Sequence, residues 1–353
     1  MSRGITLVRS NAANGRISSS SSFSRSMSRR RTLSNRSKSR RQRSSLLSSL
    51  NEIKIHPMKT VGYAGLQGRR SEMEDTHDVY QSDRFRAWAV YDGHGGKTVS
   101  NLAGRFFLSF VMKVVELTVG QMKRLSIDKM RDAITRAFVQ FDEQQIPRRS
   151  GQSQGSTVIL AIYDANTATL ITANLGDSRA ILLMHHPKTM ETKYSVVARS
   201  ITKDHKPDLL AEKKRITKAG GHVTYETKQD VSRVDGELAL SRALGDFSLK
   251  EFYNKKTHNW EYDPIKGKVS AVPDVRFMKL KTSIERGQAY RIVLACDGLW
   301  DVMSEKQVAE WINIQREQFP GISNTELCRG LAIYAINVLG STDNVSVLMD
   351  DIP

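Results

Sequence analysis

Seven short apolar runs of strand length constrain the fold more than any other feature of this chain. They are apolar or alternate between apolar and polar residues, as β-strands do. They lie at residues 61–66, 87–91, 156–163, 169–174, 180–184, 292–296 and 345–349. A doubly wound parallel sheet would place a regular helix between each pair of successive strands, and three of the six connections between these runs lack one. The pattern therefore predicts antiparallel sheets.

A few segments carry apolar residues at spacings of three and four, which predicts helices. These segments are 97–120, 126–145, 304–319 and 324–340, with a shorter helix at 209–219. Ser304 and Gln307 have the spacing of a capping box at the start of one helix. We therefore expect an α+β fold with helices packed outside the sheets. Residues 247–269 show no clear element and are too long for a passive connection, so they predict a mobile flap beside a site.

The first 52 residues differ in composition from the rest. Residues 1–50 hold eleven Arg, one Lys, seventeen Ser and no acidic residue, so they supply +12 of the formal net charge of +17. Such a segment buries too little apolar surface to fold. We predict a disordered tail at 1–52 and one catalytic domain at 53–353. The tail fits a solvated or kinase-targeted arm, a nuclear-targeting segment or a mitochondrial transit peptide.

The location and class of the protein follow from several absences in the sequence. No run approaches the roughly 20 apolar residues of a membrane span, and no secretory signal is visible. Cys296 and Cys328 are far apart in apolar segments, which predicts reduced buried thiols and an intracellular protein. Phe23 is the one aromatic residue of the tail, so we expect no dedicated nucleic-acid binding. We expect a cytosolic or nuclear monomer, with mitochondrial import as the alternative.

Acidic residues recur at the ends of the predicted strands. They are Glu74 and Asp75 in "GRRSEMEDTH", Asp92 in "VYDGHGG", Asp177 in "NLGDSR", Asp297 and Asp301 in "CDGLWD", and Asp343 in "STDN". Converging carboxylates repel one another unless a cation neutralises them, although acids on separate loops remain an alternative. Oxygen ligands without a cysteine or histidine cluster select Mg²⁺ or Mn²⁺.

A pair of such ions activates water for attack on a phosphoryl group, whose charge needs neutralising during transfer. Arg70 could bind the phosphate with two parallel hydrogen bonds, and His94 could donate a proton to the departing oxygen. Phosphate ester hydrolysis is the chemistry that this set of residues favours.

Nine segments, in this order, resemble the motifs of the metal-dependent type 2C serine/threonine protein phosphatases. They are "GRRSEMEDTH", "VYDGHGG", "GSTVIL", "ANLGDSRA", "TKDHKPD", "EKKRITKAGGHV", "DGELALSRALGDF", "LACDGLWDVMS" and "STDNVSV", and they cover about residues 58–353. The resemblance implies a four-layer α/β/β/α sandwich with the metals at one edge between the two antiparallel sheets. It also implies phosphoprotein substrates and direct attack by water.

The resemblance assigns roles residue by residue. Glu74 and Asp75 match the first acidic pair, Asp92 the ligand that bridges both ions, and Gly93 a carbonyl ligand. Asp297 and Asp343 match the remaining ligands of the metal pair, while Asp177 and Asp301 resemble the ligands of a third ion. Arg70 matches the phosphate-binding arginine and His94 the general acid.

Two features depart from the family pattern. Arg69 stands where the family often has an aromatic residue, and residues 247–269 do not align, which leaves substrate preference open. "ALSRALGDF" is interpreted as structural and His205 as a packing or turn residue. The rival functions are a catalytically silent scaffold of the same family and a nucleic-acid-binding protein that uses its basic tail.

Overall fold

The computed structural model describes residues 60–120, 126–185, 196–226, 231–281 and 289–352. All of them belong to one compact unit, Leu50–Pro353. The tail predicted at residues 1–52 lies outside the described residues. Within these ranges, no helix combines the length and the apolar character needed to cross a bilayer.

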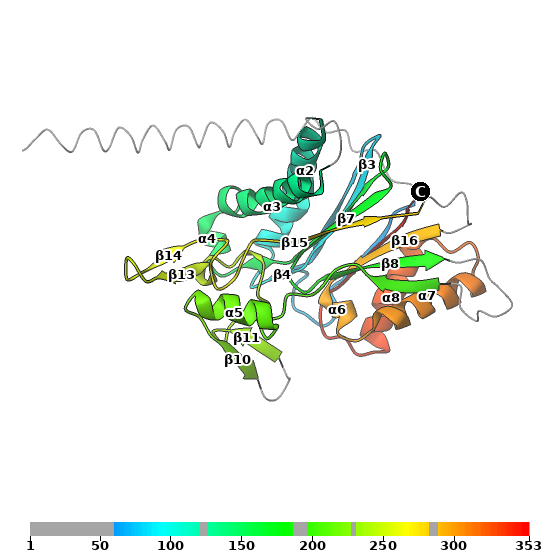
Figure 1. The fold of residues 1–353 in the computed structure, drawn as a ribbon. Coiled ribbons are helices and arrows are strands. Elements are labelled where there is room, and N and C mark those ends of the chain that lie inside the picture. The colour runs from blue at the N-terminus through cyan, green and yellow to red at the C-terminus, as the bar shows by residue number, and fades with distance from the viewer. Residues whose placement is uncertain (1–59, 121–125, 186–195, 227–230, 282–288, 353) are drawn as a thin grey trace, which may run out of the picture. The chain divides into compact units, whose positions relative to one another are not determined.

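Two five-stranded antiparallel sheets form the centre of the fold (Figure 1). Sheet I has the order β1 (Gly62–Leu66), β17 (Val345–Ile352), β16 (Ala289–Ala295), β8 (Arg179–His185) and β9 (Val196–Ser200). Sheet II has the order β15 (Asp274–Lys279), β7 (Thr169–Leu175), β6 (Val158–Asp164), β3 (Phe85–Tyr91) and β2 (Thr76–Gln81). The prediction of antiparallel sheets is confirmed.

Helices cover the outer face of each sheet, as Figure 1 shows. The helices α2 (Thr98–Gly120) and α3 (Ile127–Gln144) pack on sheet II, and α7 (Glu305–Gln318) and α8 (Asn324–Asn337) pack on sheet I. Both α7 and α8 begin with a capping box, at Ser304 and Ser323, which satisfies backbone N–H groups of the first turn. The predicted four-layer α/β/β/α sandwich is confirmed.

The alternation of side chains along the strands explains why the layers stack. In β8, Ala180 and Leu182 belong to the core between the two sheets, whereas Ile181 and Leu183 belong to the core under α7 and α8. Successive residues of a strand point to opposite faces, so a strand between two apolar layers must be apolar throughout. This is why β8 looked like a continuous apolar run in the sequence.

The smaller elements lie around this sandwich. Three are two-stranded or three-stranded sheets, made by β4 (Gly93–His94), β5 (Gly155–Ser156) and β12 (Leu244–Gly245), by β10 (Val223–Glu226) and β11 (Val231–Val234), and by β13 (Glu251–Asn254) and β14 (Asn259–Tyr262). The short helices are α4 (Arg148–Gly151), α5 (Leu210–Lys218), α6 (Asp297–Trp300) and the 3-10 helix η1 (Phe247–Leu249).

The expectation that residues 247–269 form no regular element is wrong. They contain η1 and the β13–β14 hairpin. The turn of this hairpin places His258 in the left-handed region at φ 54°, where glycine or asparagine is usual. Because the turn carries no glycine, the sequence lacked the usual hairpin signal.

The strand predicted at 345–349 continues to Ile352, through two acidic residues. Asp350 is fully buried, and its carboxylate accepts hydrogen bonds from Trp88 Nε1 at 2.8 Å, from Arg86 and from Thr60 Oγ1. These donors offset the cost of burying a charge. The strand therefore need not end where its sequence becomes acidic.

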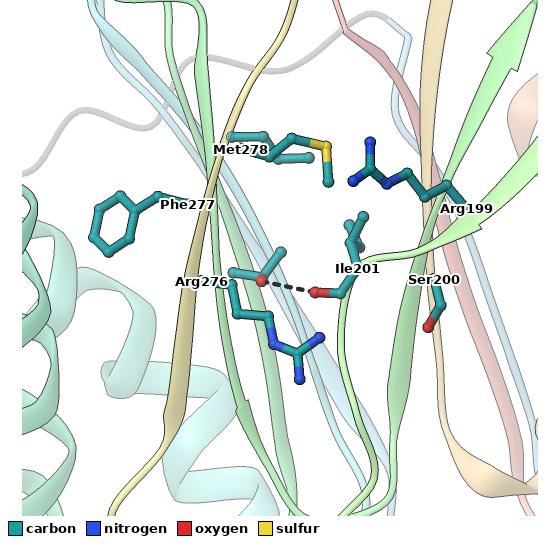
Figure 2. Close-up of a pocket in the computed structure, with 8 residues that line it drawn as sticks. Arg199, Ser200, Ile201, Arg276, Phe277 and Met278 are labelled. Atoms are coloured by element: carbon teal, nitrogen blue, oxygen red, sulfur yellow. Dashed lines mark hydrogen bonds between the residues drawn. The ribbon is translucent and has the colours of Figure 1, made fainter.

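The two sheets approach each other at the edge formed by β9 and β15. Thr172 Oγ1 of β7 donates to the carbonyl of Ile201 at 3.2 Å, across the space between the sheets. A pocket of about 200 Å³ lies here, into which Arg199 and Arg276 extend from the two edge strands (Figure 2). Arg276 also pairs with Asp274 at 3.0 Å. This pocket is lined by residues other than the predicted site residues.

Candidate metal centre and active site

Two of the predicted acids are brought together by strand pairing in sheet II. Asp75 directly precedes β2 and Asp92 directly follows β3. These strands are antiparallel neighbours, and Thr76 pairs with Tyr91. The start of β2 and the end of β3 therefore meet at one edge of the sheet, which places Asp75 beside Asp92.

The same arrangement occurs in sheet I. Asp297 comes two residues after the end of β16, and Asp343 comes two residues before the start of β17. Ala295 of β16 pairs with Val347 of β17. The fold therefore presents a second pair of acids at an edge of the other sheet.

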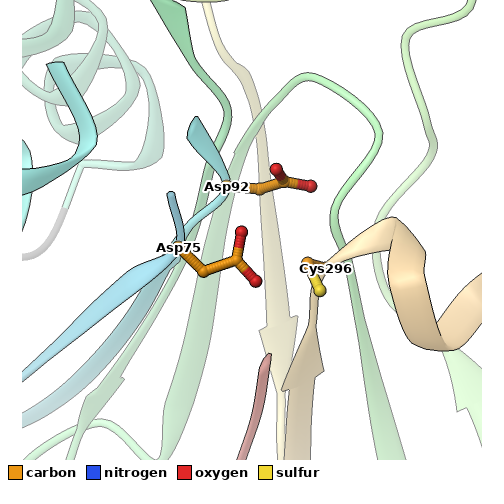
Figure 3. A group of neighbouring side chains, drawn as sticks. All are labelled: Asp75, Asp92 and Cys296. Carbon is orange, nitrogen blue, oxygen red and sulfur yellow. The ribbon is translucent and has the colours of Figure 1, made fainter. Parts of the chain in front are cut away.

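Between the sheets, side chains from both pairs converge. Ligand atoms of Asp75, Asp92 and Cys296 lie within 4.8 Å of one another, and so do those of Asp92, Asp177 and Asp297. Figure 3 shows the carboxylates of Asp75 and Asp92 and the thiol of Cys296 directed toward a common space. Asp92 belongs to both groups, and the role that the resemblance assigns to it, a ligand shared by two ions, stays a prediction.

The carboxylates of this cluster have strongly perturbed pKa values. Burial, followed by the charges of Asp75 and Asp297, raises the pKa of Asp92 well above its ordinary value. Burial and the charge of Asp177 do the same for Asp297. Burial, with a further contribution from Asp343, raises the pKa of Asp75 to about 6. Buried like charges of this kind need a cation if all are to be ionised.

The hydrogen bonding of the cluster also fits a cation. Both carboxylate oxygens of Asp75 are buried and have no hydrogen-bond partner within the described ranges. The Cys296 thiol instead donates to the carbonyl of Asn344 at 3.3 Å and accepts from the N–H of Ser346 at 3.1 Å. Burial raises the pKa of Cys296, so it stays a thiol and is a poor metal ligand. The available donors are oxygens, which suit Mg²⁺ or Mn²⁺.

Gly93 is required by close packing around the cluster. A Cβ atom there would lie 2.5 Å from the carbonyl oxygen of Glu74 and 2.6 Å from Ser100 Oγ. Ser100 Oγ in turn donates to the Glu74 carbonyl. A larger residue would push apart the segments that carry Asp75 and Asp92. The absence of a side chain at Gly93 thus allows the backbone after Asp92 to lie close to the backbone at Glu74.

The remaining predicted ligands lie around the two groups rather than in them. The carboxylates of Asp343 and Asp301 contribute to raising the pKa of Asp297, so both are electrostatically close to it. Among the described residues, neither group of ligand atoms includes Glu74, Asp301 or Asp343. The roles assigned to these three residues stay predictions.

Asn344 holds the loop that carries Glu74, a contact that sequence reasoning missed. Its side-chain oxygen accepts from the N–H of Glu74 at 2.9 Å, and its Nδ2 donates to the carbonyls of Gln67 and Glu72 at 2.8 and 3.0 Å. The one local signal for this contact is weak: an Asp-Asn pair before a strand. Asn344 is a positioning residue, since it acts on the loop and not on a reacting group.

Arg70 lies at the exposed rim of the cluster. Its guanidinium donates to the carboxylate of Asp343, and 55% of the Arg70 side chain is exposed. The adjacent carboxylates favour the charged form of Arg70 and raise its pKa, against the effect of burial. Arg70 therefore offers further N–H donors to a phosphate that reaches the cluster from solvent.

A lysine that the sequence analysis did not single out neutralises part of the cluster. Lys206 Nζ donates to Asp177 at 2.6 Å. Burial alone would lower the pKa of Lys206, but the charges of Asp177 and Asp297 raise it. The neighbouring His205 is buried, and its Nδ1 accepts from the N–H of Gly176 at 3.1 Å, so it packs the turn as predicted.

His94 is held by an aspartate from the motif that was interpreted as structural. Its Nε2 lies 2.8 Å from Oδ2 of Asp246, and the Asp246 residue is only 4% exposed. Asp246 adopts the left-handed conformation, at φ 48° and ψ 45°. Gly155 makes room for the pair, since a Cβ there would lie 2.1 Å from Asp246 and 2.3 Å from His94. Burial alone would lower the pKa of His94. The charge of Asp246 and its hydrogen bond outweigh this effect, so the pKa of His94 is raised.

We predict that Asp246→Asn will impair proton donation by His94. The variant removes the negative charge that holds and charges the imidazole, so kcat for a phosphothreonine peptide should fall by about 10-fold to 100-fold. Hydrolysis of p-nitrophenyl phosphate should fall much less, because its leaving group needs no proton. Asp235→Asn is the matched control, since Asp235 is also left-handed at φ 51° and pairs with Lys268 at 2.8 Å, away from His94. Equal losses on both substrates would contradict the prediction.

The family model described as "Protein phosphatase 2C" matches residues 60–345. The match begins just before β1 and ends at the start of β17. It therefore includes β1, β2, β3, β8 and β16 in full and the first residue of β17.

Individual relatives carry the same name or a related one. A probable protein phosphatase 2C of Caenorhabditis elegans is 35% identical over 71% of this chain and 62% of its own length. Human protein phosphatase 1A is 30% identical over 82% of this chain and 69% of its own length. The crystal structure of a phosphatase from Toxoplasma gondii superposes with a TM-score of 0.63 at 25% identity, over 82% of this chain and 93% of that one. This chain thus spans less than two thirds of the C. elegans relative.

Proposed function

Because this chain belongs to the protein phosphatase 2C family, we propose that it hydrolyses phosphoserine and phosphothreonine esters in proteins, using two Mg²⁺ or Mn²⁺ ions held by the acidic cluster. The observation that carries the proposal is the position of Asp92, which belongs to two groups of ligand atoms at once. A residue shared in this way can bridge two ions. The unpartnered oxygens of Asp75 support the same assignment.

The residues of the acidic cluster and Arg70 have different roles in the proposed reaction. When bound, the ions lower the pKa of water and neutralise charge on the phosphoryl oxygens. Asp92, Asp75 and Asp297 would hold them, and Asp177 would supply a further carboxylate beside Asp92 and Asp297. Arg70 binds the phosphate from the rim with its guanidinium.

His94 donates the proton that the departing serine or threonine oxygen requires. Its Nε2 faces Asp246, so Nδ1 is the atom left for donation. A covalent mechanism through cysteine is disfavoured, because Cys296 and Cys328 are both buried and burial raises the pKa of each.

The test is hydrolysis of a phosphothreonine peptide while Mn²⁺ or Mg²⁺ is titrated in, with and without chelator, for the natural chain and Asp297→Asn. We expect turnover that requires the metal and that collapses in the variant. Metal binding is followed separately by calorimetry. Folded protein that binds metal but hydrolyses no phosphoester would instead support the silent scaffold.

Several expectations depend on parts of the chain outside the described residues. The boundary at residue 52, the role of the basic tail and the choice between a cytosolic, nuclear or mitochondrial location remain predictions. So do the monomeric state and the third ion at Asp177 and Asp301.

A further inference from the structure

A groove of about 610 Å³ lies between α5 and the β13–β14 hairpin. We call it the hairpin groove and define it by Lys218, Phe252, Tyr253, Lys255, Ile265 and Lys266, which are among its lining residues. It is separate from the acidic cluster, since none of these residues is a predicted site residue. The hairpin side of the groove belongs to residues 247–269, which do not align with the family pattern, whereas its α5 side, with Lys218, belongs to the matching segment "EKKRITKAGGHV".

The walls of the hairpin groove are fixed to each other by hydrogen bonds to backbone carbonyls, one from a backbone N–H and two from a side chain. The N–H of Tyr253 donates to the carbonyl of Ala219, at the end of α5, over 3.0 Å. Arg215 Nη1 donates to the carbonyls of Gly267 and Lys268 at 2.6 and 2.9 Å. A groove that is held in this way is formed before any ligand arrives, which lowers the entropic cost of binding.

The groove exposes apolar surface that the fold itself does not cover. Tyr253 is 37% exposed and Ile265 is 52% exposed, and Trp260, which lies 5.7 Å from Tyr253 between ring centroids, is 48% exposed. Aromatic and aliphatic side chains gathered in a concave site are typical of recognition surfaces. A ligand with at least one apolar side chain would bury them.

The charge of the groove is uniformly positive. Its charged lining residues are lysines and one arginine, and its described lining includes no aspartate or glutamate. Lys266 pairs with Asp263 at 3.1 Å and Arg215 with Glu212 at 2.9 Å. Lys218 and Lys255 are exposed and have no carboxylate partner among the described residues. These two ammonium groups are available to an acidic ligand.

A short stretch of chain connects the hairpin to Asp246, the residue whose carboxylate lies within hydrogen-bond distance of His94. Asp246, which contacts His94, precedes β13 by only five residues. Lys250, between them, is fully buried and pairs with Asp142 of α3 at 2.6 Å. The hairpin wall is therefore anchored beside the site where the phosphorylated residue would react.

We propose that the hairpin groove binds an acidic segment with apolar side chains, located in a phosphoprotein substrate outside the phosphorylated residue. This rests on the proposed phosphatase function. The charge of the groove argues against the other occupants: residues 1–50 carry +12 and a second copy of the chain carries a net +17. An acidic partner is attracted where these are repelled.

The test compares two phosphothreonine peptides that differ only in a flanking segment, one rich in Glu and Leu and the other with each Glu replaced by Gln. Full-length protein is assayed as Lys218→Glu/Lys255→Glu and as the control Lys129→Glu/Lys281→Glu, which changes the same charge at exposed lysines outside the groove. The groove variant should raise KM about tenfold for the acidic peptide, leave kcat unchanged, and leave p-nitrophenyl phosphate hydrolysis unchanged. The control should behave as the natural chain does.

Binding of the unphosphorylated acidic peptide, followed by fluorescence anisotropy, separates this proposal from the proposed function. If the natural chain hydrolyses nothing but binds this peptide, and the groove variant does not, the groove is supported and the phosphatase proposal fails. If the natural chain hydrolyses both peptides with equal KM, the groove proposal is overturned while the phosphatase proposal stands. A change in sedimentation coefficient caused by the groove variant, or tighter binding of a peptide of residues 1–50, would also overturn it.

Discussion

Asp92→Asn should abolish most of the activity while making the metal-free protein more stable. Asp92 is the residue common to both groups of candidate ligand atoms, so the amide removes a negatively charged carboxylate from each. We expect kcat to fall by about 1,000-fold, which corresponds to about 4 kcal/mol of transition-state stabilisation. In metal-free protein the same change removes a buried charge that Asp75 and Asp297 repel, so the melting temperature should rise by a few degrees.

The predicted gain in stability of metal-free Asp92→Asn should depend on pH in a definite direction. The pKa of Asp92 is raised in the folded state, so the folded protein holds its proton at pH values where the unfolded chain has lost it. Below the unfolded pKa of about 4 the group is protonated in both states and has no effect. As pH rises above that value, the metal-free natural chain should lose stability, and Asp92→Asn should lose less.

Asp78→Asn is the matched control for Asp92→Asn. Burial raises the pKa of Asp78 to about 7, so this change also removes an unfavourable buried charge. Asp78 lies within β2 and is not among the predicted ligands. It should stabilise the protein without loss of activity. If both variants lost activity equally, the cause would be a disturbance of the β2–β3 strand pair and not the loss of a shared metal ligand.

The second large effect is expected at the buried pair of Asp142 and Lys250. Both side chains are fully buried, with Asp142 Oδ1 2.6 Å from Lys250 Nζ and 2.7 Å from the N–H of Gly245. Asp142→Ala leaves an unpaired ammonium in the interior, so the free energy of unfolding should fall by about 3–5 kcal/mol. Urea denaturation measures it.

Two further variants show whether the charge is the cause. Asp142→Leu/Lys250→Met replaces both partners by apolar groups and should recover most of the lost stability. Asp128→Ala removes an exposed carboxylate that pairs with Arg131 on the same helix, and it should change nothing measurable. A double variant as unstable as Asp142→Ala would show that packing, not the orphaned charge, dominates.

The sequence predicted the parts of the site that depend on strand ends, because these carry local signals. Asp92 follows an apolar strand and precedes glycines, and the structure places it at the centre of the cluster. The partner of His94 could not be predicted in the same way, since Asp246 reaches it through a left-handed backbone conformation that its sequence neighbours do not specify. Lys206 likewise meets Asp177 only through tertiary structure.

In the fold, too, the elements with local sequence signals were predicted, and those that depend on distant contacts were not. Strands with continuous apolar sequence, such as β3, β6 and β8, were predicted with nearly correct bounds. The hairpin of β13 and β14 was missed because its exposed strands pack on little and its turn has no glycine. The extension of β17 through Asp350 was missed because its stabilising donors, Arg86 and Trp88, lie more than 260 positions away.

The strand order of sheet I has a consequence for synthesis of the protein on the ribosome. β1, at residues 62–66, pairs within the described sheet with β17, at residues 345–352. Nearly 280 residues must be translated before β1 can find its partner, and a contact so distant in sequence forms slowly. The segment that carries Asp75 follows β1 directly. A ribosome-bound chain therefore cannot complete sheet I, and with it the β16–β17 edge that carries Asp297 and Asp343, until translation has passed β17.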